Sequence, residues 1–133
     1  MSDIALLIER AAAGSVAVNG NVIFDTVKFT AGNISYNSGT GVITFNEAGR
    51  YEVHWWVTTQ SSQTTNGIVF ALVSSQGDLI IGDSPIRTGE VVGMGIIEVA
   101  APPVTLSLVN WGDAAVIYGS LVPIRASLDR KSV

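Results

Sequence analysis

Hydrophobic and polar positions alternate along residues 49–59, which makes this segment the clearest strand signal in the chain. One face carries only apolar and aromatic residues, namely Tyr51, Val53, Trp55 and Val57. β-branched and aromatic residues favour strands, and a period of two places alternate side chains on opposite faces. The pattern therefore predicts a central strand that buries Tyr51, Val53 and Trp55 in the core.

The opposite face of the same strand combines a large aromatic with polar and charged residues, namely Glu52, His54, Trp56 and Thr58. A sheet surface in contact with water rarely carries Trp, and a core surface rarely carries Glu or His. A half-polar face with an aromatic anchor is typical of a subunit interface. We therefore predict that this face lies between copies of the chain.

Further runs with a period of two continue almost to the end of the chain, separated by turns rich in Gly, Asn, Ser and Pro. The runs cover 16–18, 22–30, 34–36, 42–45, 68–73, 79–81, 90–100, 104–110 and a last region within 115–128. Eight to ten short strands at this spacing predict an all-β fold, an antiparallel β-sandwich of the jelly-roll type.

The first fourteen residues show a different pattern and are interpreted as a leader before a single domain over 15–133. Ser2 or Asp3 could cap a short amphipathic helix whose apolar positions are Ile4, Leu7, Ile8 and Ala11. The alternative is a frayed leader without regular structure. No linker divides the remaining residues, so we expect one domain.

Charged residues make up only 14% of the 133 residues, whereas about a quarter is usual for a domain. Two explanations are open. Much of the surface lies hidden in an oligomer, or abundant Ser, Thr, Asn and Gly keep an exposed surface neutral. Both can hold together, and the first agrees with the two-faced central strand.

Charge and composition exclude several classes of function. The net charge is −4 and the seven basic residues are scattered, which argues against a nucleic-acid partner. The chain has no Cys, so thiol nucleophiles, disulfides and Cys-ligated metals are excluded. Every apolar run is shorter than the ~20 residues needed to span a membrane. The N-terminus lacks a basic start and a long apolar run, so a signal peptide is not expected.

Individual candidate sites have ordinary structural explanations. His54 is the only histidine, and no nucleophile in a strained turn accompanies it, so no catalytic residue and no enzyme activity is predicted. Asp78 and Asp83 lack the dense carboxylate pattern of a calcium loop, so neither a metal nor a cofactor is expected. Gly93 and Gly95 suggest close approach of another backbone, and Trp111 either stacks on a sugar or covers the end of the sandwich.

The spacing around the central strand resembles the signature of the C1q/TNF-like globular domain. The matching positions are Tyr36, Ile43, Gly49, Tyr51, Val53 and Trp55, with Ile43 and Val53 where the pattern has Phe. The chain is most similar to the bacterial heads of collagen-like glycoproteins on the outer layer (exosporium) of Bacillus and Clostridium spores. They share the absence of Cys, the low charge, the Thr/Ser/Gly-rich loops and a last strand like residues 124–128.

This resemblance implies a jelly roll that assembles as a homotrimer and places Val92, Met94 and Ile96 on the interface with the central strand's polar face. It implies a structural head domain that trimerises on a spore surface and displays a surface to other surface-layer proteins or glycans. Spore proteins are made inside the mother cell, which agrees with the lack of a signal peptide. The alternative is a trimeric ligand- or carbohydrate-binding module, or a phage fibre tip.

Overall fold

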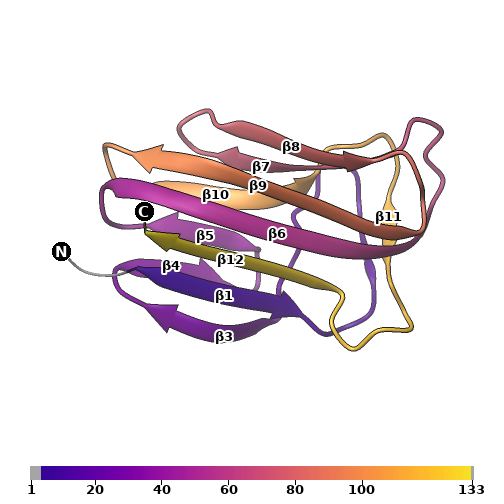
Figure 1. Ribbon diagram of the computed structural model, residues 1–133, viewed down its shortest axis with the longest axis horizontal. Helices are drawn as coiled ribbons and strands as arrows, with labels where there is room; N and C mark the ends of the chain where they lie inside the picture. Colours follow the sequence, from indigo (N-terminus) through magenta and orange to yellow (C-terminus); the bar gives the residue numbers. More distant parts are fainter. Residues whose placement is uncertain (1–3, 133) are drawn as a thin grey trace.

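The computed structural model describes residues 4–132, which form twelve β-strands in two packed antiparallel sheets (Figure 1). The predicted all-β sandwich is confirmed, with twelve strands where eight to ten were expected. These residues include no helix that is long and apolar enough to span a membrane. The strands are β1 (Ala5–Arg10), β2 (Ser15–Val16), β3 (Thr26–Ala31), β4 (Ile34–Asn37), β5 (Val42–Phe45), β6 (Gly49–Ser62), β7 (Ile68–Ser74), β8 (Leu79–Ser84), β9 (Gly89–Val99), β10 (Val104–Asn110), β11 (Val116–Tyr118) and β12 (Ala126–Ser132).

Strand β6 is the centre of the sheet that faces the viewer in Figure 1, here called the front sheet. The order of its strands is β2-β11-β6-β12-β1-β3. Strands β11 and β12 pair with successive parts of one edge of β6, and β9 pairs with the opposite edge. The back sheet has the order β4-β5-β10-β7-β8. Because β6 pairs with β9 from Gly49 to Thr59 and with β12 from Tyr51 to Val57, it has a strand on both sides along most of its length.

The core lies between the two sheets, and aromatic side chains of β6 connect them. Tyr51 and Trp55 are each 1% exposed and Val53 is fully buried. The Tyr51 ring stacks on Phe45 of the back sheet at 4.6 Å, and Trp55 meets Phe70 edge-on at 6.1 Å. Such pairs add about 0.5–1.5 kcal/mol beyond the area that they bury, so they help to hold the front sheet on the back sheet.

The helix expected between residues 4 and 11 is not formed. Residues 5–10 are strand β1, which pairs with β12 on one side and with β3 on the other. The run Ala-Leu-Leu-Ile is apolar at every position, so it fits either period, and Leu6 and Ile8 enter the core. A short isolated helix is marginal in water, whereas two neighbouring strands offer ladder hydrogen bonds on both edges. The sandwich therefore includes residues assigned to the leader, while Ser2 and Asp3 lie outside the described residues.

Two other strand boundaries differ from the sequence pattern. Residues 22–25 precede β3 as a segment without regular secondary structure, and an isolated bridge joins Asn21 to Val109 of β10. Val22 and Phe24 of this segment are still buried, which explains why their alternation looks like a strand. The last strand begins at Ala126, because residues 119–125 form a loop.

Gly93 and Gly95 make room for side chains of their own chain, which corrects the expectation that they admit the backbone of a neighbouring copy. A Cβ atom at Gly93 would lie 2.2 Å from Cζ2 of Trp55, and one at Gly95 would lie 2.6 Å from Cδ1 of Ile80. Both glycines therefore face inward. Their missing side chains leave the space that the Trp55 ring and Ile80 occupy.

A polar brace holds the turn between β1 and β2. The Arg10 guanidinium donates hydrogen bonds to the carbonyls of Ala12, Ala13 and Ile23. The Asp25 carboxylate accepts hydrogen bonds from the backbone amides of Ala11 and Ala12 at 3.0 and 2.9 Å. Burial opposes ionisation of Asp25, but the two amide hydrogen bonds, a hydrogen bond from Thr26 and the charge of Arg10 together outweigh it, so the pKa of Asp25 lies below its usual 3.8.

Because this pKa is lowered by folding, the contribution of Asp25 to stability is present above the unfolded pKa and is lost as the pH falls through the folded one. We expect an Asp25→Asn variant to melt lower than wild type at pH 7. The gap between the two should narrow as the pH approaches 3. Thermal melts across this range measure both effects, and a constant gap at every pH would contradict the role given to the carboxylate.

Candidate subunit interface

Strand β9 presents a strip of aliphatic side chains to solvent. Val92, Met94 and Ile96 are 60%, 58% and 55% exposed in the single chain. Their neighbours Val91 and Ile97 point inward and are buried, as strand alternation requires. Monomeric soluble proteins seldom expose a continuous apolar surface of this kind, and such surfaces mark contact sites.

The strip on β9 lies beside the mixed face of β6. In the ladder between these strands, Val92 is opposite Trp56, Met94 is opposite His54 and Ile96 is opposite Glu52. Glu52, Trp56 and Thr58 are half-buried, and His54 is exposed. The seven residues assigned to the interface from the sequence therefore lie on the outward side of two neighbouring strands.

A band of charged groups follows the apolar strip across the sheet. In the ladder between β6 and β12, His54 is opposite Asp129 and Glu52 is opposite Lys131. His54 Nε2 lies 3.9 Å from Glu52 Oε1, so the imidazole forms an ion pair with this carboxylate when it is protonated. The band thus carries both signs of charge, and a partner surface need not supply a large opposite charge.

A second apolar patch lies at the far edge of the same face, and the sequence pattern did not reveal it. Leu7 of β1 is opposite Asp129 on one side and Phe29 of β3 on the other. Phe29 is 57% exposed. The sequence did contain evidence for this patch, because residues 4–8 would be apolar on both faces of a strand. Interpreting the segment as a helix led us to overlook its outward face.

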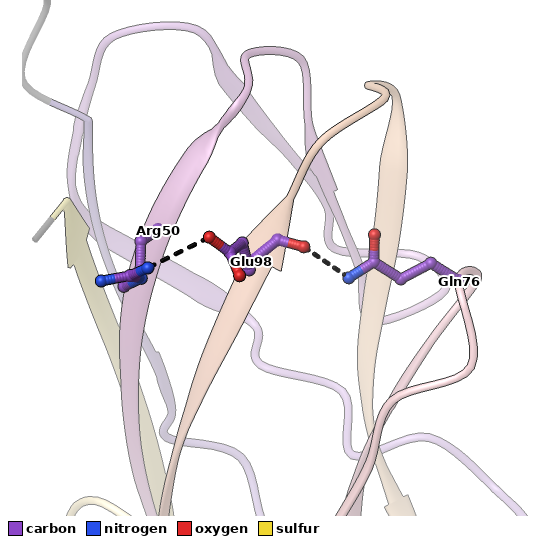
Figure 2. Close-up of polar contacts among 3 residues, drawn as sticks. All are labelled: Arg50, Gln76 and Glu98. Atoms are coloured by element: carbon purple, nitrogen blue, oxygen red, sulfur yellow. Dashed lines mark hydrogen bonds and ion pairs between the residues drawn. The ribbon is translucent and has the colours of Figure 1, made fainter.

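The apolar strip ends at a polar cluster, which Figure 2 shows. Arg50 of β6 and Glu98 of β9 form an ion pair with 3.1 Å between Nη2 and Oε1. The Gln76 side chain, from the turn between β7 and β8, donates a hydrogen bond to the Glu98 carbonyl at 2.8 Å. Both charged side chains are more than half exposed, so the pair contributes at most about 1 kcal/mol. It marks one limit of the strip.

The remaining candidates from the sequence occupy separate places. Asp78 accepts hydrogen bonds from Ser74 and Gln76 within its own turn, and Asp83 is exposed on β8. Within residues 4–132, no three His, Cys, Asp or Glu side chains are close enough to hold a metal ion. Trp111 is 44% exposed at the end of β10, so the core of the sandwich does not enclose it.

The sequence matches no protein-family model and no curated protein, whereas the three-dimensional structure resembles several solved structures. Murine APRIL shares 11% identity with a TM-score of 0.71, over 98% of this chain and 99% of that one. The globular domain of the zebrafish complement 1qA protein shares 14% with a TM-score of 0.67, over 97% and 94%. The fold is a C1q/TNF-like jelly roll. The PRD1 vertex protein P5 is also similar, at 14% identity and a TM-score of 0.62 over 99% and 96%.

At 11–14% identity, these likenesses show the fold alone. They agree with the fold that the spacing around β6 suggested. In this C1q/TNF-like jelly roll, the apolar strip of β9 and the mixed face of β6 make one continuous surface. That surface is the candidate site.

Proposed function

We propose that this chain is a structural head domain that assembles as a homotrimer through the outward face of β6 and β9. The observation that carries the proposal is the exposed strip of Val92, Met94 and Ile96 beside Trp56. The resemblance around β6 to trimeric C1q/TNF-like domains supplies the number of copies. The low charge of the chain supports a surface that is partly covered.

Burial of this strip contributes favourable free energy to a contact between copies. Complete burial of one exposed Val, Ile or Met side chain contributes about 1.5–3 kcal/mol, and these side chains are a little over half exposed, so each adds part of that amount. Each copy brings three such side chains and part of the Trp56 ring, and a closed ring repeats the contact three times. The polar residues of β6 and β12 then supply specificity, because charges at an interface select register more than they add affinity.

The proposal extends to the place where the trimer acts. The similarity to exosporium heads supports a position on a bacterial spore surface, where the trimer displays an interaction surface to other surface-layer proteins or to glycans. In this role the domain needs neither catalytic residues nor a cofactor. Antibody labelling of intact spores of the source organism tests the position, and labelling only after spore lysis would contradict it.

We expect the purified protein to have three times the mass of one chain. Light scattering coupled to gel filtration at micromolar concentration measures this directly. A monomer or a dimer under these conditions would overturn the proposed assembly. Raising the salt concentration separates the apolar from the electrostatic contribution to the subunit contact. A trimer held mainly by the apolar strip should persist at high salt, whereas one held mainly by surface charges should dissociate more readily.

A further inference from the structure

A groove lies near the C-terminal end of β6. This end of β6 is at the right in Figure 1. We call this groove the threonine groove, and its lining residues are Thr58, Thr59, Gln60, Thr88, Gly89, Gly119, Ser120, Leu121 and Val122. Its volume is about 440 Å³. Among the described residues that line it, none is Asp, Glu, Lys or Arg.

The hydroxyl groups of the three threonines that line the groove donate hydrogen bonds within the chain. Thr58 donates to the Arg125 carbonyl at 2.9 Å, Thr59 to the Arg87 carbonyl at 3.1 Å and Thr88 to the Gln60 carbonyl at 2.7 Å. A polar group is costly to cover only when it loses water without gaining a hydrogen bond. Covering these threonines with an apolar group therefore carries little desolvation cost.

Apolar side chains stand around the groove. Leu121 is 97% exposed, Val122 is 39% exposed, and both line it. Ile86 is 58% exposed, and its Cδ1 lies 3.3 Å from the position of a Cβ at Gly89. A single exposed leucine is common, but three neighbouring aliphatic residues around a groove whose threonine hydroxyls are bonded within the chain indicate a contact surface.

We infer that a second copy of this chain covers the threonine groove, so that Leu121 is buried in the assembly. The groove continues the candidate interface, because Thr58 follows Trp56 on the outward face of β6 and is opposite Glu90 of β9. A neighbouring subunit that covers Val92 and Trp56 needs to reach only slightly further along β6 to cover Thr58 as well. This inference rests on the proposed trimer and adds the loop of residues 119–125 to its interface.

The absence of Cys allows a direct test, because a single introduced thiol is then the only one in the protein. We would measure the rate of maleimide labelling of Leu121→Cys in the native protein and in urea, with the native mass recorded on the same sample. Ser35→Cys is the matched control, because Ser35 is exposed on β4 of the back sheet. Neither change removes a buried side chain, so both variants should fold.

In a trimer, we expect native Leu121→Cys to react at least about tenfold more slowly than in urea, because a buried group reacts only after local opening. Ser35→Cys should show no such protection. Equal reactivity of the two thiols in an intact trimer would overturn this inference while leaving the trimer in place, and the groove would then be open to another apolar ligand. A monomeric wild type would overturn both proposals. A monomeric Leu121→Cys beside a trimeric wild type would support the contact.

Discussion

A Gly93→Ala variant should lose about 3 kcal/mol of folding stability or more, because the new methyl group overlaps a ring that cannot move aside. The Cβ atom would lie 2.2 Å from Cζ2 and 2.4 Å from Cε2 of Trp55. The backbone of β8 blocks retreat, because a Cβ at Gly82 would itself lie 2.7 Å from the same ring. For a domain of this size, the loss corresponds to a fall of roughly 10 °C in melting temperature.

Gly112→Ala is the matched control for this experiment. The nearest atom to a Cβ at Gly112 lies at 3.4 Å, which is ordinary contact, so this variant should melt close to wild type. Both melts need the same protein concentration, because assembly raises the melting temperature. A Gly93→Ala protein with the wild-type melting temperature would contradict this prediction, because it would show that a methyl group fits between β9 and the Trp55 ring.

A second variant tests whether the stability loss in Gly93→Ala comes from overlap with Trp55. Replacing Trp55 by Phe removes the ring atoms that the new methyl group would touch, although Trp55→Phe has its own cost. We expect Gly93→Ala to be less destabilising in the Trp55→Phe background than in wild type. The difference between the two backgrounds is the coupling free energy of the pair, which is large for residues in contact and small for distant ones.

The largest effect on assembly is expected from Met94→Glu, which should convert the trimer into a folded monomer at micromolar concentration. Met94 is 58% exposed in the single chain, so a carboxylate there remains hydrated and the fold is preserved. In the assembly, the same carboxylate would be taken out of water opposite His54, which is a cation only when protonated, so no permanent opposite charge is provided. An unpaired buried charge costs several kcal/mol per ion. Because the trimer is symmetric, each of its three subunits bears this cost.

Ser35→Glu introduces the same charge on the back sheet, and this control should remain trimeric. Light scattering gives the mass of each variant, and circular dichroism confirms that each is folded. A trimeric Met94→Glu protein would place the contact on another face, and the patch of Leu7 and Phe29 would then be the next surface to test. An unfolded Met94→Glu protein would contradict the exposure of this side chain.

The sequence alone was sufficient for the fold class and for the two faces of the central strand. Alternation at residues 49–59 places Tyr51, Val53 and Trp55 inside and their neighbours outside, because side chains in any strand alternate whatever lies next to it. The turn residues between the shorter runs likewise mark where the strands end. These properties depend on the backbone geometry of a few consecutive residues, which composition and order determine.

Only the tertiary structure decided which strands are neighbours and what fills the space between them. Residues 5–10 are apolar on both faces, so they could be helix or strand until β12 and β3 offered an edge on each side. Gly93 and Gly95 of β9 could have faced a second copy, but a side chain at Gly93 would overlap the Trp55 ring of the paired strand β6, and one at Gly95 would overlap Ile80 of β8. The threonine groove likewise combines residues of β6 and β9 with Thr88 and with residues 119–122 of the loop before β12. Contacts between such distant residues depend on how the whole chain packs, and no local pattern contains them.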